Sequence, residues 1–543
     1  MQSRLKGIFA ALAVATTGAS GVSADAGEAW RYGVLADTQG AGAYPDVSTR
    51  LMAPVVDRFI NAHQVDMLLS VGDLTDRGSR PENELWLDTA KPIYDAGIPL
   101  YATRGNHDIK TDAFTVVDDP GDFGPTNVHD TTIWDDQIPV PNNPTMGNGP
   151  GASSYFQHRN LFAVQIDLYG ATPTELIGWL QGEALVAAVE SDAEHKVLFQ
   201  HAPYFGKGRP GVLAGDAGGQ RSLLEGMAAA GIDTIYTGHD HQYSRSVALN
   251  PEGEVLLNHL VVGSNSEKYY RYEEAPGPNE GQAVQVNDRV SYSIVDVDGP
   301  MVAFSHYTSA APDPGTTEAW TPEWELTDRM VYMSGGDQYY VEANGSFTGL
   351  ESSSENGTRA AITAGTNSAF ETRFTEPDEG DGDPVRVELG AVVNFGWLDG
   401  EEDPRVLGDI LVLDGLANDP VGAESDTYTL KMYYDDSGIT DETSLVLAFL
   451  DESSDTWKQA TEGNFPMAPQ VASLSGLAYG VNTEENYVWA ELNHNASGTQ
   501  FAVVPLPAGA PLMLSGLGGL ALLGRGRAAR RQPEARGSAE KAA

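Results

Sequence analysis

Short apolar segments alternate with helix-like segments in the first part of the chain, and each apolar segment ends at a polar cluster. Trp30–Ala36, Met67–Val71 and Pro99–Thr103 are β-rich runs, and Val47–His63 and Glu82–Ala96 between them have apolar residues at helical spacing. This order of strand and helix predicts βαβ units, in which functional loops follow the carboxyl ends of the strands.

The same alternation continues toward residue 310. Lys196–Phe199 and Thr234–Tyr236 are strand-like, the helix-like Gln220–Ala230 lies between them, and Leu260–Val262 and Ser291–Val297 follow as further strands. We therefore predict an α/β catalytic domain over residues 28–310.

A polar stretch from Thr111 to Gly151, rich in Asp, Pro, Asn and Gly, interrupts this alternation. Loops of such length in compact domains are often functional. The stretch either shapes a substrate pocket or is a solvated insertion, and the sequence leaves both interpretations open. His129 within it is a minor candidate for substrate contact.

Beyond a Pro-rich linker, predicted at residues 311–329, the helical spacing disappears. Short alternating runs such as Tyr428–Tyr434 and Ser444–Phe449 are bounded by Asp, Gly and Ser clusters at the spacing of a β-sandwich. We predict an all-β accessory domain over residues 330–502. Its acidic stretch Asp378–Asp383 has ligand types that calcium prefers, but a solvated loop is the favoured interpretation.

Composition limits the chemistry that the chain can perform. Its 543 residues include 77 acidic and 32 basic ones, and the net charge of -45 disfavours nucleic acid as a partner. There is no cysteine, so disulfides, thiolate metal sites and Cys nucleophiles are excluded. Any metal site must use His, Asp, Asn or Glu.

Both ends of the chain have features of targeting segments. Arg4 and Lys6 precede an apolar run, and Val22-Ser23-Ala24 has the small-x-small pattern of a signal-peptidase site, so residues 1–24 are predicted to be a cleaved signal peptide. At the other end, Val504-Pro505-Leu506-Pro507-Ala508 leads into an apolar run to Leu523 that is followed by four arginines.

This C-terminal layout resembles the Val-Pro-Leu-Pro-Ala type of sorting signal in Gram-negative bacteria. The resemblance implies that residues 503–531 are a sorting signal with a transmembrane helix that anchors the protein transiently in the inner membrane. An exosortase-type enzyme would then process it, and the protein would reach the cell surface or the medium, with periplasmic or membrane-anchored forms as alternatives. The polar tail at residues 532–543 is longer than such signals usually carry.

Five polar blocks in the N-terminal half carry the candidate chemistry, and each directly follows a strand-like run. Taken singly, each block has the composition of an ordinary turn. Together, their His, Asp and Asn side chains are hard to explain as turn chemistry alone. The blocks are Asp37-Thr38-Gln39, Gly72-Asp73-Leu74-Thr75-Asp76-Arg77-Gly78, Gly105-Asn106-His107-Asp108, Gln200-His201-Ala202-Pro203 and Gly238-His239-Asp240-His241.

The order of these blocks resembles the calcineurin-like metallophosphoesterase superfamily, over residues 37 to 241. The resemblance implies a β-sandwich flanked by helices, and hydrolysis of phosphate mono- or diesters by a metal-activated hydroxide at a dinuclear site. Its cofactors would be two divalent ions (Mn, Zn or Fe). Residue by residue, it implies that Asp73 bridges the two ions, with Asp37 and His241 on the first and Asn106, His201 and His239 on the second. Gln39 is a further candidate ligand of the first ion.

Three further residues have roles beside the metals. The resemblance implies that His107 protonates the leaving oxygen or stabilises the transition state, and that Asp76 orients its ring. Arg77 is a candidate for binding phosphate oxygens through bidentate hydrogen bonds, and a purely structural ion pair is the alternative.

Two positions depart from patterns within the superfamily. Gln39 occupies the position where the first block normally has His, and its neutral amide oxygen is a weaker ligand that favours a harder ion at the first site. Asp76 stands where purple acid phosphatases have Tyr, so a tyrosinate-to-iron site is not expected. The alternative function is a secreted binding or adhesion protein with a decayed metal domain, in which the all-β domain carries the interaction.

Overall fold

The computed structural model describes most of the predicted catalytic and all-β domains. The described residues are 29–40, 47–109, 138, 146–206, 217–270, 277, 279–287, 289–312, 320–342, 345–367, 386–401, 403–416, 427–451, 453–464, 479–493 and 499–505. The predicted signal peptide, His129, the acidic stretch Asp378–Asp383 and residues 506–543 of the predicted sorting signal and tail lie outside them. Among the described residues, no helix has the length and apolar character needed to span a membrane.

Two facing sheets form the catalytic domain. In the first sheet, β1, β2 and β3 are parallel neighbours, and β12, β13 and β14 continue it in antiparallel order. Its strands, in spatial order, are β14 (Glu325–Met333), β13 (Met301–Ala310), β12 (Arg289–Asp298), β1 (Trp30–Leu35), β2 (Met67–Ser70) and β3 (Leu100–Ala102).

The second sheet has β6, β7, β8 and β10 as parallel neighbours, with antiparallel strands at both sides. Its strands, in spatial order, are β19 (Arg386–Glu388), β11 (Glu280–Val286), β9 (Tyr243–Leu249), β10 (Val255–Val262), β8 (Thr234–Thr237), β7 (His195–Phe199), β6 (Leu161–Gln165), β5 (Ser154–His158) and β4 (Gly147–Asn148).

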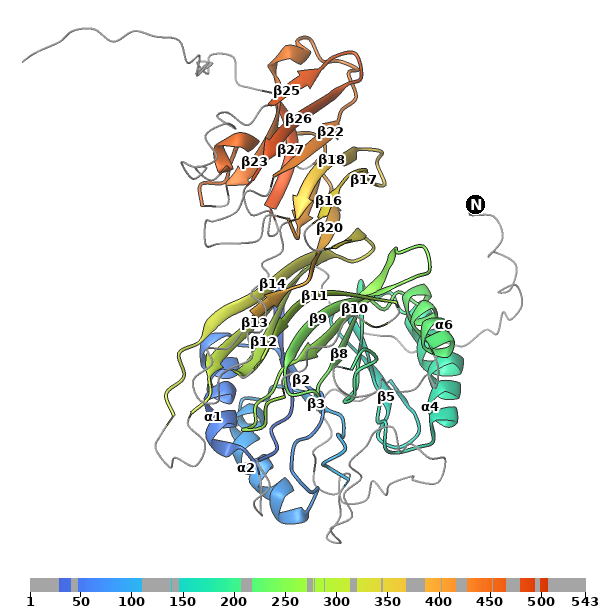
Figure 1. Cartoon of the computed structure of the whole chain (residues 1–543), viewed down its shortest axis with the longest axis vertical. Coiled ribbons are helices and arrows are strands. Elements are labelled where there is room, and N and C mark those ends of the chain that lie inside the picture. Colours follow the sequence, from blue (N-terminus) through green and yellow to red (C-terminus); the bar gives the residue numbers. More distant parts are fainter. Residues whose placement is uncertain are drawn as a thin grey trace, which may run out of the picture. The chain divides into compact units, whose positions relative to one another are not determined.

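Helices cover the outer face of each sheet (Figure 1). α1 (Thr49–Asp57), η1 (Arg58–Ala62) and α2 (Arg80–Asp95) pack on the first sheet through Phe59 and Trp86. α4 (Pro173–Trp179), η3 (Leu180–Ala184), α5 (Leu185–Glu190) and α6 (Ala217–Ala229) pack on the second. The main core lies between the sheets and includes Tyr32, Phe199 and Tyr236, all at most 1% exposed. The resulting four layers agree with the predicted sandwich flanked by helices.

The start of α2 shows how the sequence places a helix directly behind the second block. Ser79 precedes the helix, and the carboxylate of Glu82 accepts hydrogen bonds from both the N–H and the hydroxyl of Ser79, at 3.1 and 2.9 Å. Such a capping arrangement satisfies backbone donors that have no partner within the helix. It fixes the end of the Gly72–Gly78 loop, because Ser79 directly follows Gly78.

The C-terminal region is all-β, as predicted, and consists of two antiparallel sheets around a core that includes Ile362, Leu411 and Leu430. One sheet contains β15 (Asp337–Glu342), β20 (Gly390–Leu398), β21 (Leu407–Asp414), β27 (Thr499–Pro505), β23 (Leu445–Asp451) and β24 (Thr456–Gln459). The other contains β16 (Gly345–Phe347), β18 (Arg359–Asn367), β22 (Tyr428–Tyr433), β26 (Tyr487–Leu492) and β25 (Tyr479–Asn482), with β17 (Leu350–Ser353) beside β18. Short 3-10 turns occur at η4 (Glu442–Ser444) and η5 (Ala460–Gly463).

Two strands cross the predicted domain boundaries. β14 begins inside the predicted linker and pairs with β13, so the first sheet continues to Met333. β19 belongs to the predicted accessory domain but pairs with β11 of the second sheet. In addition, the Asp414 carboxylate of β21 accepts a hydrogen bond from the Val331 N–H at 2.8 Å. The physical reason is that strand pairing depends on backbone groups at a sheet edge, which the Pro-rich composition of the linker does not reveal.

Candidate metal centre

The polar blocks meet because each follows a strand whose carboxyl end points to the same edge. The first, second and third blocks follow β1, β2 and β3, which are parallel in the first sheet. The fourth and fifth follow β7 and β8, which are parallel in the second sheet. In open α/β sheets this edge is where ligands bind.

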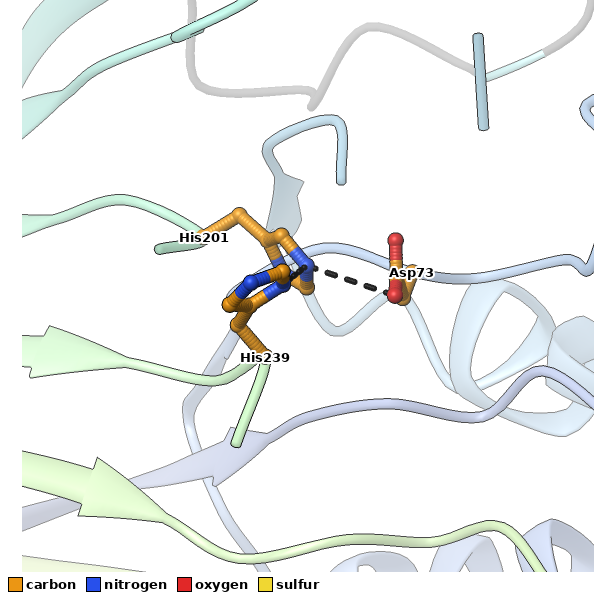
Figure 2. A group of neighbouring side chains, drawn as sticks. All are labelled: Asp73, His201 and His239. Carbon is orange, nitrogen blue, oxygen red and sulfur yellow. Dashed lines mark hydrogen bonds and ion pairs between the residues drawn. The ribbon is translucent and has the colours of Figure 1, made fainter. Parts of the chain in front are cut away.

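One group of buried side chains consists of Asp73, His201 and His239, whose potential ligand atoms lie within 4.8 Å of one another (Figure 2). His201 Nε2 is 3.3 Å from Asp73 Oδ2 and 3.2 Å from His239 Nδ1. Asn106 joins this group, because its Oδ1 lies 3.1 Å from His201 Nε2 and 2.9 Å from His239 Nδ1. The predicted second ligand set is therefore assembled in space.

A second group consists of Asp37, Asp73 and His241, also within 4.8 Å and also buried. His241 Nε2 lies 3.6 Å from Asp37 Oδ1. Gln39 Nε2 is 2.9 Å from Asp73 Oδ2 and 3.0 Å from His241 Nε2, so Gln39 lies beside this group. Asp73 belongs to both groups.

Backbone carbonyls orient two of the imidazole rings. His201 Nδ1 lies 2.9 Å from the Val71 carbonyl, and His241 Nδ1 lies 3.0 Å from the Lys268 carbonyl. A ring nitrogen that donates to a carbonyl leaves the other nitrogen as a lone-pair donor, which is the tautomer that a metal ligand needs. The other nitrogen of each ring is Nε2, which lies near the Asp73 carboxylate in His201 and near the Asp37 carboxylate in His241.

The local backbone is strained where the ligands attach. Asp37, Asp73, His239 and His241 have φ angles of 50°, 52°, 74° and 51°, in the left-handed region that non-glycine residues rarely adopt. Such strain persists when surrounding structure compensates for it, and it concentrates at functional sites.

Gly105 permits the close approach of the second and third blocks. A Cβ atom on Gly105 would lie 2.0 Å from Asp73 Oδ1 and 2.3 Å from its backbone nitrogen. Because no other residue lacks this atom, glycine is required at position 105. The neighbouring His107 N–H uses the space to donate to Asp73 Oδ1 at 2.8 Å.

Burial sets the electrostatics of the centre. Desolvation raises the pKa of Asp37 well above its ordinary range. Burial also acts to raise the pKa of Asp73, but the His201 imidazole outweighs it and holds that pKa well below the ordinary range. Burial lowers the pKa of His241 to about 3, so its ring is neutral near pH 7. Burial therefore disfavours the ionised form of Asp37, and a bound cation would favour it.

The buried donors fit divalent metal ions. Imidazole nitrogens and carboxylate oxygens are ligand types that divalent metal ions accept in proteins. The Gln39 Oε1 atom is buried and has no hydrogen-bond partner among the described residues. Rotation of the Gln39 amide exchanges the positions of its oxygen and nitrogen. The Oε1 atom could then lie on the side of Asp73 and His241, where it could bind a metal ion.

His107 and Asp76 form the predicted pair. His107 Nδ1 lies 2.9 Å from Asp76 Oδ1 and 3.0 Å from the Asp76 carbonyl. Burial acts to raise the pKa of Asp76, but hydrogen bonds from His107 and Lys268 outweigh it and hold that pKa well below its ordinary range. The carboxylate is therefore ionised and orients the ring. Arg77 Nε lies 3.6 Å from Asp76 Oδ2, and the Arg77 side chain is 31% exposed.

Sequence reasoning missed two contributions to the site. Asp108 lies in the third block, and its carboxylate accepts from the N–H groups of Leu74, Thr75 and Gly105 at 3.2, 3.0 and 2.8 Å, so it ties the second block to the third. Lys268 Nζ donates to Asp76 Oδ1 at 2.9 Å. Asp108 is the last residue of the third block, but the sequence predicts no role for it. No spacing signal identifies Lys268.

Comparisons with known proteins agree with this geometry. Residues 31–243 match the family model described as calcineurin-like phosphoesterase. No curated protein sequence matches the chain.

Several solved structures match part of the chain at low identity. Plasmodium GAP50, the anchor in the inner membrane complex, is 14% identical, with 55% of this chain and 89% of that chain covered and a TM-score of 0.35. Purple acid phosphatase PPD1 from yellow lupin (Lupinus luteus) seeds is 11% identical, with 56% and 54% covered and a TM-score of 0.40. Chaetomium thermophilum Vps29 is 11% identical, with 56% and 97% covered and a TM-score of 0.24.

The family match confirms the predicted superfamily and the predicted enzyme class, a metallophosphoesterase acting on phosphoric ester bonds. The fold and the clustered His and Asp side chains agree with it. Residues 31–243 therefore form a calcineurin-like phosphoesterase domain.

Proposed function

We propose that this protein is an exported phosphoesterase that hydrolyses phosphate mono- or diesters with two divalent metal ions. The observation that carries the proposal is the position of Asp73, which belongs to both groups of potential metal ligands. A carboxylate shared in this way is suited to bridge two cations about 3.5–4 Å apart. Export rests on the sequence features of residues 1–24 and 503–531.

Each ligand has a defined place in this proposal. Asp37, Gln39 and His241 would hold the first ion, Asn106, His201 and His239 would hold the second, and Asp73 would contribute to both. When bound, the ions supply a nucleophilic oxygen from water at neutral pH and neutralise charge on the phosphate. The carbonyls of Val71 and Lys268 keep the His201 and His241 rings in the ligating tautomer.

His107 is proposed to assist the leaving group. Its side chain is 16% exposed, whereas the ligand rings His201 and His241 are 0% and 2% exposed, so His107 is accessible to a substrate. Its Nδ1 is held by Asp76, which leaves Nε2 to donate a proton or a hydrogen bond to the departing oxygen.

The test is hydrolysis of p-nitrophenyl phosphate and bis-p-nitrophenyl phosphate by the purified chain, stripped of metal and resupplied with Mn²⁺, Zn²⁺ or Fe²⁺. We expect activity that depends on added metal. Absence of hydrolysis of either ester with every metal would favour a binding function instead.

Two variants separate the proposed roles. His107→Ala should lower kcat by about 10²- to 10⁴-fold, the usual contribution of a general acid, with metal content unchanged by plasma mass spectrometry. Asp73→Asn should lose bound metal as well as activity. Asp95→Asn is the matched control, because its carboxylate is 63% exposed on α2 and should alter neither property.

A further inference from the structure

The polar side chains of the site differ sharply in their access to solvent. The ligands Asp37, Asp73, His201 and His241 are at most 2% exposed. The side chains beside them are more open, at 10% for Asp76, 16% for His107, 20% for Lys268 and 31% for Arg77. Of the described side chains at the site, the last three therefore offer nitrogen donors that solvent can reach.

Two permanently charged cations, Lys268 and Arg77, lie beside the Asp76 carboxylate. Lys268 Nζ lies 2.9 Å from Asp76 Oδ1, the same oxygen that His107 contacts, and Arg77 Nε lies 3.6 Å from Asp76 Oδ2. We call Arg77, His107 and Lys268 the rim of the site, and Arg77 and Lys268 are its permanently charged cations.

The backbone holds Lys268 in place from the opposite sheet. The segment Gly263–Lys268 follows β10, and the Lys268 N–H donates to Ser266 Oγ at 3.0 Å. Asn265 Nδ2 donates to the carbonyls of Ala36 and Ser291 at 3.2 and 2.7 Å, which ties this segment to the residue that directly precedes Asp37. The Lys268 charge is therefore preorganised and needs little reorganisation to meet an anion.

Phosphomonoesters and phosphodiesters present different charges to such a rim. Near pH 7 a monoester is predominantly a dianion with three terminal oxygens, whereas a diester is a monoanion with two terminal oxygens and a second ester group. Ammonium and guanidinium groups form charge-assisted hydrogen bonds to phosphate oxygens. A second ester group at the rim would remove water from the cations without supplying a charge in return.

We propose that Lys268, together with Arg77, binds the terminal oxygens of the substrate and selects phosphomonoester dianions over diesters. This inference rests on the proposed function, because it assigns the substrate class of the same site. It makes Lys268 a specificity-determining residue for that reaction.

The experiment compares kcat/KM for p-nitrophenyl phosphate and bis-p-nitrophenyl phosphate in the wild-type chain, Lys268→Met and Lys268→Arg. We expect the wild type to prefer the monoester. Lys268→Met should lower kcat/KM for the monoester by about 10- to 100-fold, the effect of one charge-assisted hydrogen bond, and for the diester by less than about 3-fold. Lys268→Arg should restore most of the preference, because it restores the charge.

A second readout is independent of turnover. Calorimetry with inorganic phosphate and dimethyl phosphate should show that Lys268→Met loses affinity for inorganic phosphate by about 10-fold or more and leaves dimethyl phosphate almost unchanged. Lys91→Met is the matched control, because Lys91 is 62% exposed and pairs with Asp95 on α2. It removes the same charge from the chain. It should leave unaltered both the ratio of kcat/KM for the two esters and the ratio of affinities for inorganic phosphate and dimethyl phosphate.

The outcomes distinguish this inference from the proposed function. Equal losses on both esters in Lys268→Met, or a wild type that prefers the diester, would overturn the inference and leave the phosphoesterase proposal standing. Hydrolysis of neither ester by the wild type would overturn the phosphoesterase proposal. In that case the calorimetric comparison still decides whether Lys268 selects the dianion.

Discussion

Arg104 and Asp167 form a buried ion pair directly behind the third polar block. Arg104 Nη2 and Nε lie 2.6 and 3.1 Å from Asp167 Oδ2, and the two side chains are 2% and 0% exposed. Replacing Arg104 with Met keeps an apolar stem of similar length but removes the cation. The Asp167 carboxylate then stays buried without its charged partner.

Loss of one partner from a buried pair destabilises a protein by about 3–5 kcal/mol. In this protein Asp167 retains two backbone donors, the N–H groups of Ala152 and Tyr169, at 2.9 and 3.0 Å. We therefore expect a loss near the lower limit, about 3 kcal/mol in the free energy of unfolding. Adding Asp167→Asn to Arg104→Met removes the buried charge and should recover about 1 kcal/mol or more.

Urea denaturation followed by tryptophan fluorescence measures these differences. Lys91→Met is the control, because its ion pair with Asp95 is about two-thirds exposed and should contribute less than about 0.5 kcal/mol. The reasoning is refuted if Arg104→Met lies within about 1 kcal/mol of the wild type, or if the double variant is less stable than the single one.

Three further predictions follow from the geometry of the domain. Gly105→Ala should abolish metal binding, measured by plasma mass spectrometry, because its Cβ would lie 2.0 Å from Asp73 Oδ1. Gly226→Ala in α6 is the control and should retain metal binding, because its Cβ would meet no atom within 4 Å. Gln39→His should tighten Zn²⁺ binding in competition with a chelator by about 10-fold or more, because imidazole is a stronger ligand than an amide. Burial raises the folded-state pKa of Asp233 to about 6. The free energy of unfolding should therefore fall as pH rises from about 4 to 6, and Asp233→Asn should flatten that slope in urea titrations.

Much of the catalytic domain could be predicted from local patterns. The runs predicted at Trp30–Ala36 and Met67–Val71 correspond to β1 and β2, and Glu82–Ala96 corresponds to α2. Apolar periodicity is a local property, so the sequence reports it directly. The residue types of the blocks also limited the chemistry, because a chain without cysteine that places His and Asp after strands can bind metal only through nitrogen and oxygen.

The contribution of Lys268 was decided by tertiary structure alone. Its carbonyl contacts His241, which is 27 residues earlier, and its ammonium contacts Asp76, which is 192 residues earlier. Both contacts depend on the parallel pairing of β10 with β8, which places the segment after Val262 beside the segment after Thr237. The sequence of Gly263–Lys268 has no motif that would indicate this role.

The domain boundary and the strained backbone of the candidate ligand residues were also decided by tertiary structure. Composition located a Pro-rich segment before Glu325, but the pairing of β14 with β13 and of β19 with β11 was not visible in it. The positive φ angles of Asp37 and Asp73 were likewise not predictable, because these residues adopt them only under the constraint of neighbouring strands. Sequence by itself determined which side chains could bind metal and where strands end. Only the tertiary structure decided which cations surround Asp76, because contacts between distant segments depend on how the strands pair.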